Sequence, residues 1–144
     1  MNSYNEANKI LTERFGGDNF IGLTTTDGTR VITRVVNACY QDGAFYVVTS
    51  AVSNKMKQID KNSVVAVFCG ESVGTYINAH GVGENMGHVL AEKNTVIMAK
   101  LRDAFSRWYN DGDVNENDPN TCLLRIRLTD GLYSVDFVPE HYSE

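Results

Sequence analysis

The stretch FIGLTTT-DG-TRVITRVVNACY-QDG-AFYVVT, residues 20–49, decides the fold. Its three apolar runs are rich in aromatic and β-branched residues, which are typical of strands. Asp27-Gly28 and Gln41-Asp42-Gly43 separate the runs, and an Asp-Gly pair in such a place is a strong hairpin signal. The sequence therefore predicts antiparallel strands at residues 20–26, 29–40 and 44–49.

The rest of the chain adds further strands and a few helices. Ser3 and Glu6 match a capping box, and a stripe of apolar residues that ends near Trp108 has helical spacing. The run VVAVF is continuously apolar, so we expect a strand buried on both faces, and Asp130-Gly131 predicts a turn before the last strand. The expected helices cover residues 3–14, 53–60 and 94–109, and the expected strands cover residues 64–68, 75–83, 121–128 and 132–138.

This order of elements predicts a mainly β fold. Six or seven strands joined by short turns, with two or three helices, describe an antiparallel barrel or sandwich with an early and a late amphipathic helix. A doubly wound α/β fold would need a helix after nearly every strand, and the first three strands lack one. A length of 144 residues is typical of one domain, so we expect a single domain over residues 1–144.

Composition narrows the classes of partner. The formal net charge is −5, which argues against a protein held to nucleic acid or to an anionic membrane by electrostatics. Cys39, Cys69 and Cys122 form no C-x-x-C pair, so neither a disulfide framework nor a cysteine zinc site is expected. We see no basic and apolar leader and no run long enough to span a membrane, so the cytoplasm is the expected compartment.

Arg34 is unusual for its place in the second strand. It shares a face with the apolar residues Ile32, Val36 and Ala38, so it needs an anion, an acidic partner or a position at the rim. A rim arginine with a snorkelling stem is the ordinary alternative.

The loop TSAVSNK, residues 49–55, carries the parts of a phosphate site. It supplies hydroxyl groups, the N-terminus of a short helix with free N–H groups, and a lysine in the first helical turn. Alone it could be an ordinary helix cap with a solvated lysine. Together with Arg34, one hairpin strand away, it predicts that Arg34 and Lys55 converge on one anion.

These segments resemble a known family. Thr33-Arg34-Val35-Val36, then residues 42–49, then Ser53-Asn54-Lys55 resemble the flavin-binding split β-barrel proteins related to pyridoxamine 5′-phosphate oxidase, and most closely the general stress protein 26-like branch. The resemblance covers nearly the whole chain, because the first helix, the hairpins, Trp108 and Asp118-Pro119 also fall in family order.

The resemblance implies an antiparallel split barrel of six to seven strands that binds FMN at the interface of a homodimer. Arg34 and Lys55 would hold the FMN phosphate, and Tyr76 or Asn78 would approach from nearby or from the second subunit. Trp108 would cover the cofactor or pack in the core. The implied cofactor-binding residues are Arg34, Val35, Val36, Thr49, Ser50, Ser53, Asn54, Lys55, Tyr76 and Trp108.

The resemblance leaves several functions open. An FMN-dependent oxidoreductase of an unknown small-molecule substrate is the first, and a non-enzymatic FMN-binding general stress protein is the second. A relative that binds haem or a deazaflavin is the third. The chain ends without the basic segment by which pyridoxamine phosphate oxidases grip their substrate, so vitamin B6 oxidation is not expected. No residue is nominated as catalytic.

A spacing of four residues separates His80, Glu84 and His88, as in some metal sites. The stretch is rich in glycine and is not expected to be helical, so these residues would not share a face. No metal site is predicted.

Overall fold

The structure is a computed structural model that describes residues 3–144. Its main elements in that range are seven strands and three α-helices, with a short 3₁₀ turn at Glu92–Asn94 and a π-helical turn at Tyr109–Asp113. The strands are β1 Asn19–Thr26, β2 Val31–Gln41, β3 Ala44–Ser50, β4 Val64–Ser72, β5 Thr75–His88, β6 Thr121–Val135 and β7 Val138–Ser143. The helices are α1 Tyr4–Phe15, α2 Asn54–Lys61 and α3 Thr95–Ala104.

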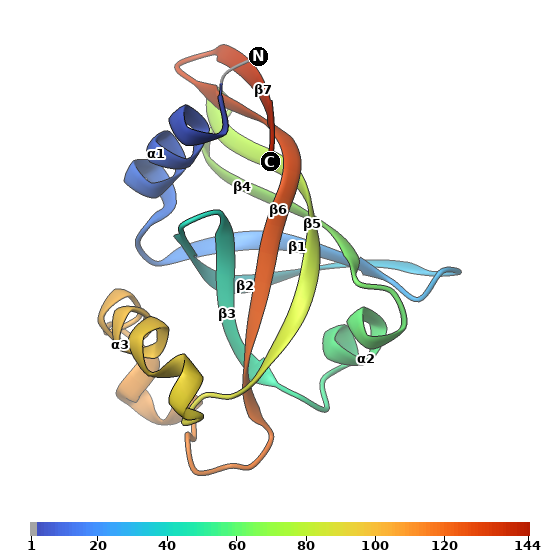
Figure 1. Ribbon diagram of the computed structural model, residues 1–144, viewed down its shortest axis with the longest axis vertical. Coiled ribbons are helices and arrows are strands. Elements are labelled where there is room, and N and C mark those ends of the chain that lie inside the picture. The colour runs from blue at the N-terminus through green and yellow to red at the C-terminus, as the bar shows by residue number, and fades with distance from the viewer. Residues whose placement is uncertain (1–2) are drawn as a thin grey trace.

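The sheet closes on itself. Its strand order is β3-β2-β1-β4-β5-β6-β7, every pairing is antiparallel, and β3 also pairs with β6. Six strands therefore form a closed barrel, and β7 lies outside it on the free edge of β6 (Figure 1). The predicted mainly β fold, an antiparallel split barrel with an early and a late helix, is confirmed.

The first hairpin follows from its turn residues. The Asp27 carboxylate accepts hydrogen bonds from the backbone N–H groups of Thr29 and Arg30, at 2.9 and 2.8 Å. Gly28 has φ +96°, which L-residues other than glycine rarely adopt. This local chemistry reverses the chain between β1 and β2, as the sequence predicted.

The prediction that the fourth strand is buried on both faces is wrong. In β4 the side chains alternate, with Val65 and Val67 in the core and Val64 and Phe68 on the surface. The strand lies between β1 and β5 in the barrel wall, and its outer face is uncovered in the described chain. The continuous apolar run therefore marks an exposed apolar surface rather than a doubly buried strand.

The prediction of a turn at Asp130-Gly131 is also wrong. Strand β6 runs through both residues to Val135, and the chain reverses at Asp136 and Phe137, which have φ of +49° and +66°. Gly131 faces Ala79 of β5, and a β-carbon on it would lie 2.7 Å from the Ala79 Cβ. The glycine thus permits a close approach of two strands and does not mark a turn. The chain beyond the expected last strand, which was predicted to end at residue 138, forms β7.

The late helix is shorter than predicted. Helix α3 ends at Ala104, and Trp108 lies beyond it in the turn that precedes the π-helical segment. Trp108 packs against Phe105, with ring centroids 4.9 Å apart, so the apolar stripe continues in space after the regular helix ends.

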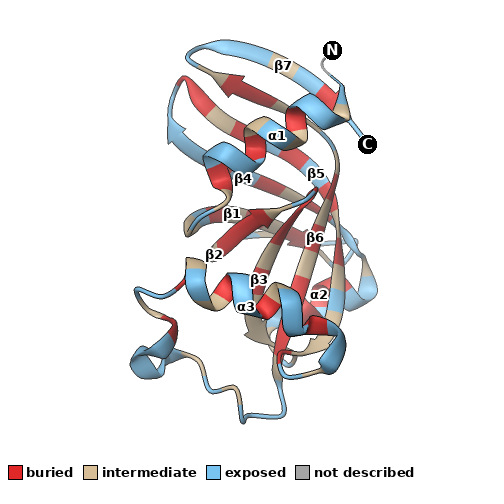
Figure 2. Cartoon of the chain, turned by 60° about the vertical axis from the view of Figure 1, so that its left-hand side comes forward, coloured by how far each residue is buried: buried red, intermediate tan, exposed pale blue. Residues whose placement is uncertain are grey.

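The buried residues form two clusters. The larger fills the barrel and takes residues from α1 and α2, among them Leu11, Phe15 and Ile59. The smaller lies outside the barrel, where Met98 and Leu101 of α3 pack on the sheet, and Figure 2 shows α3 crossing the barrel wall there. None of the helices in residues 3–144 has the length and hydropathy that a membrane crossing requires.

We expect Gly131→Ala to destabilise the fold. The new methyl group would overlap Ala79 and the Asn78 carbonyl oxygen, which lies 2.9 Å from the position of the added carbon. Overpacking of this kind lowers the free energy of unfolding by roughly 1–3 kcal/mol. Chemical denaturation measures the change. Gly17→Ala is the matched control, because a β-carbon on Gly17 would meet nothing within 4 Å. Equal stability of the two variants would contradict the close packing of β5 and β6.

Candidate functional site

Arg34 lies on the inner face of β2 and is held by a chain of hydrogen bonds. Its Nη1 donates to the Thr25 hydroxyl oxygen at 2.7 Å and lies 3.5 Å from the Leu23 carbonyl oxygen. Thr25 is buried, and its hydroxyl donates to the side-chain carbonyl of Gln58, which is buried on α2. The guanidinium group is therefore fixed where β1, β2 and α2 meet.

Lys55 lies in the first turn of α2 and is half-buried. Burial lowers its pKa from the ordinary 10.5, and the positive charge of Arg34 lowers the pKa further. Its ammonium nitrogen lies 3.5 Å from the Ser53 hydroxyl oxygen. The charge of Arg34 therefore acts on the Lys55 ammonium group, and the convergence of the two cations on one anion stays a prediction.

The two cations lack a compensating negative charge. Neither forms an ion pair with a carboxylate in residues 3–144. Arg34 is half-buried, and burial lowers its pKa as well. Partly desolvated like charges that face each other are unfavourable without a partner, so an anion bound between them would relieve both the desolvation and the repulsion.

The beginning of α2 adds backbone donors. Ser53 has the extended backbone of a helix cap, but its side chain makes no capping hydrogen bond and its hydroxyl lies beside Lys55 instead. Asn54 is the first residue of the helix and is exposed. The N–H groups at a helix start attract anions, so this end of α2 suits the same ligand as the two cations.

Thr49 and Ser50 end strand β3 close to this place. Thr49 pairs with Cys122 of β6, and the Cys122 thiol is an electrostatic neighbour of Lys55. Both residues also line a cavity of about 260 Å³ beneath the acidic segment 112–118. Thr49 is therefore paired with a neighbour of Lys55. The Ser50 hydroxyl accepts a hydrogen bond from the Val52 N–H at 3.4 Å.

The residues that follow Arg34 on β2 point alternately to the inner and the outer face of the barrel. Val36 is half-buried on the inner face, whereas Val35 is 70% exposed on the outer face. Asn37, on the same outer face, and Trp108 line a cavity of about 460 Å³. The Trp108 indole N–H and the Asn37 amide donate to the two oxygens of Asp18, at 2.9 and 3.0 Å. Trp108 therefore lies near the outer face of β2 rather than beside Arg34.

Tyr76 lies on β5, which is separated from β2 by β1 and β4. Its ring stacks on Phe68 of β4 at 5.7 Å. Asn78 is nearer in register, because Val35, Gly22, Phe68 and Asn78 form one row across β2, β1, β4 and β5. Within one subunit the structure therefore brings neither Tyr76 nor Asn78 to Arg34 and Lys55.

Thr25 and Gln58 are residues of the site that the sequence analysis missed. Strand β1 alternates with Ile21, Leu23 and Thr25 buried, so Thr25 is the polar member of an apolar face. That break in the pattern was a usable signal, of the same kind as Arg34. Nothing comparable marked Gln58, because short helices commonly carry glutamine on the surface.

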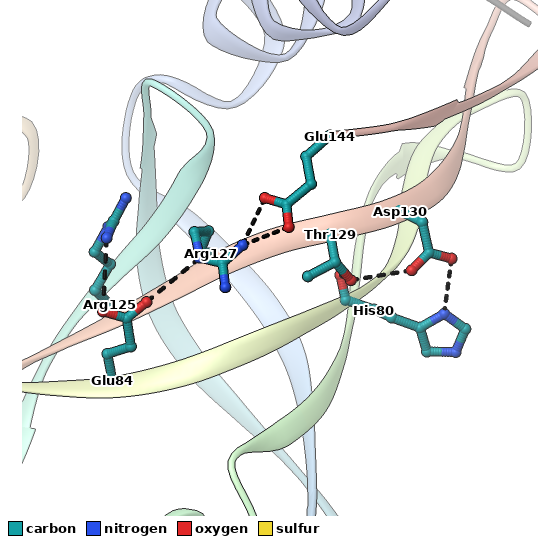
Figure 3. Close-up of polar contacts among 7 residues, drawn as sticks. All are labelled: His80, Glu84, Arg125, Arg127, Thr129, Asp130 and Glu144. Carbon is teal, nitrogen blue, oxygen red and sulfur yellow. Dashed lines mark hydrogen bonds and ion pairs between the residues drawn. The ribbon is translucent and has the colours of Figure 1, made fainter.

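The histidines of β5 have other partners. His80 Nδ1 lies 3.2 Å from the Asp130 carboxylate, and Glu84 faces Arg125 and Arg127 (Figure 3). His88 Nε2 lies 2.9 Å from a backbone carbonyl oxygen in the acidic loop. No group of three histidine, cysteine or acidic side chains within the described residues could hold a metal ion.

Comparison with known proteins places the fold. No family model and no curated protein sequence matches the chain. Among solved structures, general stress protein 26 from Bacillus anthracis str. Sterne is similar with a TM-score of 0.74 and 21% identity, over 96% of this chain and 99% of that one. A FAD-binding protein from Mesorhizobium loti has a TM-score of 0.64 and 17% identity, over 88% and 90%. The heme storage protein HutZ from Vibrio cholerae has a TM-score of 0.68 and 15% identity, over 93% of this chain and 95% of that one.

These neighbours define the architecture of the chain. Pyridoxamine 5′-phosphate oxidase-like proteins, general stress protein 26 and flavin-binding split-barrel proteins share its fold, and so do haem-binding proteins. The chain therefore has the split-barrel fold of these proteins. The resemblance of fold drawn from the sequence is confirmed at the level of structure.

We expect Lys55→Met to stabilise the ligand-free protein. Because the pKa of Lys55 is lower in the folded chain, the unfolded chain binds more protons between the folded pKa and 10.5. The destabilisation is complete below the folded pKa and disappears as the pH rises toward 10.5. The variant should therefore exceed the parent in free energy of unfolding at pH 7, and the gap should narrow toward pH 10.

Urea denaturation at several pH values measures this gap. Lys57→Met, an exposed lysine on the same helix, is the control that should leave stability nearly unchanged. A lower free energy of unfolding for Lys55→Met at pH 7 would contradict the claim that the buried charge of Lys55 and its repulsion by Arg34 destabilise the ligand-free protein.

Proposed function

We propose that the chain binds FMN, with the phosphate between Arg34 and Lys55 and the N-terminus of α2. The observation that carries this proposal is the pair of partly desolvated cations without an acidic partner. A phosphate dianion matches the charge of the pair and accepts hydrogen bonds from both side chains. Ser53, Asn54 and Thr49 would add hydroxyl and amide donors around it.

The ring system would follow β2 away from the phosphate. Val35 and Val36 come directly after Arg34 and would offer backbone groups and apolar contacts to the isoalloxazine. The Trp108 cavity next to Asn37 lies further along the same strand. Tyr76 or Asn78, which are remote from Arg34 in one subunit, would approach the cofactor from a second subunit.

FMN supplies hydride and single-electron chemistry when bound, and the chain supplies binding and orientation. We therefore propose a cytoplasmic flavin-dependent oxidoreductase of a small-molecule substrate. A non-enzymatic FMN-binding stress protein uses the same site and differs only in turnover. Steady-state oxidation of NADH or NADPH by the flavin-loaded protein, tested with several acceptors, separates the two functions.

Haem is a second candidate ligand because two of the similar structures are described as haem proteins. Its propionate groups could use the same two cations. Of the three histidines, however, His80 is bonded to Asp130 and His88 to a backbone carbonyl. A Soret band in the purified protein would favour haem, and tighter binding of a deazaflavin than of FMN would favour that cofactor.

We further propose that a second copy of the chain covers the outer face of β1, β2 and β4. Phe20, Val35 and Phe68 are exposed there by 73%, 70% and 49%. They belong to neighbouring strands, and Val35 and Phe68 share one row across the sheet. An apolar surface of this kind on a barrel wall is typical of an interface between subunits.

Replacing the two cations tests the cofactor proposal. Arg34→Ala and Lys55→Ala should each weaken FMN binding roughly ten- to a hundredfold, because each removes a charged hydrogen bond to phosphate. Fluorescence quenching of FMN on titration measures the dissociation constant. Lys57→Ala should bind FMN like the parent. FMN binding that is absent in the parent, or unchanged in both variants, would refute the assignment.

A charged residue on the outer face of β1, β2 and β4 tests whether a second copy of the chain covers that face. Val35→Glu should convert a dimer into monomers in analytical ultracentrifugation, because the carboxylate would be buried without a partner. Leu90→Glu, at an exposed leucine outside this face, should leave the dimer intact. A monomeric parent protein would contradict the interface.

A further inference from the structure

A second cavity lies between α3 and the outer surface of the barrel. Its volume is about 340 Å³, within the range of small-molecule sites. Tyr46, Met86, Ile97 and Leu123 supply apolar surface to it from β3, β5, α3 and β6. None of these residues belongs to the proposed FMN site.

Cations gather at this apolar surface. Lys93, Lys100 and Arg125 line the cavity, and Asp42 is the one acidic residue that lines it among the described residues. The Asp42 carboxylate accepts a hydrogen bond from the Asn8 amide at 3.2 Å. Lys93 and Lys100 form no ion pair within residues 3–144. The lining therefore has an excess of positive charge.

Arg125 has an unused donor. Its Nη1 lies 3.6 Å from Glu84, which also faces Arg127, and Arg127 is bonded in turn to Glu144 (Figure 3). One carboxylate is thus divided between two guanidinium groups. The Nε of Arg125 is buried and has no hydrogen-bond partner. A buried N–H without an acceptor is rare in folded proteins, and this one leaves the Arg125 guanidinium group only partly paired.

We propose that this cavity binds a small amphipathic anion, namely a carboxylate or phosphate monoester on an apolar body. The apolar surface would hold the body, and Lys93, Lys100 and Arg125 would hold the charged group. The volume of about 340 Å³ is at the lower end of the range of small-molecule sites, which suits a compact ligand. This inference is independent of the proposed FMN site, which uses other residues.

The experiment is a titration of ¹⁵N-labelled protein with 4-phenylbutyrate, phenyl phosphate and the neutral 4-phenylbutyramide. The two anions should cause saturable shifts of the backbone amides of Asn94, Ile97 and Leu123, with dissociation constants on the order of 0.1–1 mM. The neutral amide should bind at least several-fold more weakly. Shifts of equal size with the amide, or shifts confined to Arg34 and Lys55, would overturn the proposal.

Matched variants test whether Lys93 and Lys100 bind the anionic group of the ligand. Replacing both Lys93 and Lys100 by alanine should weaken 4-phenylbutyrate about tenfold, since each is an exposed cation, and replacing both by arginine should preserve binding. The double alanine variant of Lys9 and Lys57, exposed lysines that do not line the cavity, should bind like the parent. The dispersion of the backbone amide signals in each variant shows that the fold is intact. Unchanged affinity in the first double variant would refute the site.

Discussion

The pairing of β3 with β6 is the constraint on which the rest of the structure depends. It joins residues 44–50 to residues 121–127, far apart in the sequence, and closes six strands into a barrel. Closure removes the two free edges that an open sheet would expose and fixes which side of every strand faces the core. Because β6 also pairs with β5 and β7, this one strand sets the register of half the sheet.

Closure of the barrel also accounts for the electrostatic repulsion between Arg34 and Lys55 at the candidate site. Arg34 faces inward because its register on β2 is fixed, and α2 brings Lys55 toward it when Met56 and Ile59 pack into the barrel core. The hydrophobic free energy of that packing is larger than the repulsion between two partly solvated charges. The fold therefore brings Lys55 within the electrostatic influence of Arg34, and a bound anion would relieve the repulsion.

Local features of the fold could be predicted from the sequence, and features that depend on distant partners could not. Asp27-Gly28 forms its hairpin through hydrogen bonds within four residues, whereas Asp130-Gly131 lies inside a strand because β5 approaches it closely. The same dipeptide thus has two meanings, and only the partner strand decides between them. The unusual place of Arg34 on an apolar strand face could be read from the sequence, but the hydrogen bond between Thr25 and the buried Gln58 depends on the packing of α2.

The cation pair Arg34 and Lys55 and the cations of the α3 cavity differ in physical character, although both belong to a protein with a net charge of −5. The acidic surface repels anions at long range, so anion binding depends on short-range contacts. At Arg34 and Lys55 desolvation strengthens those contacts, and hydrogen bonds through Thr25 hold the geometry before a ligand arrives. At the α3 cavity the lysines are exposed and screened, so an apolar body must supply much of the binding free energy. The two proposed anion sites would therefore select different ligands, one by charge and the other by apolar shape.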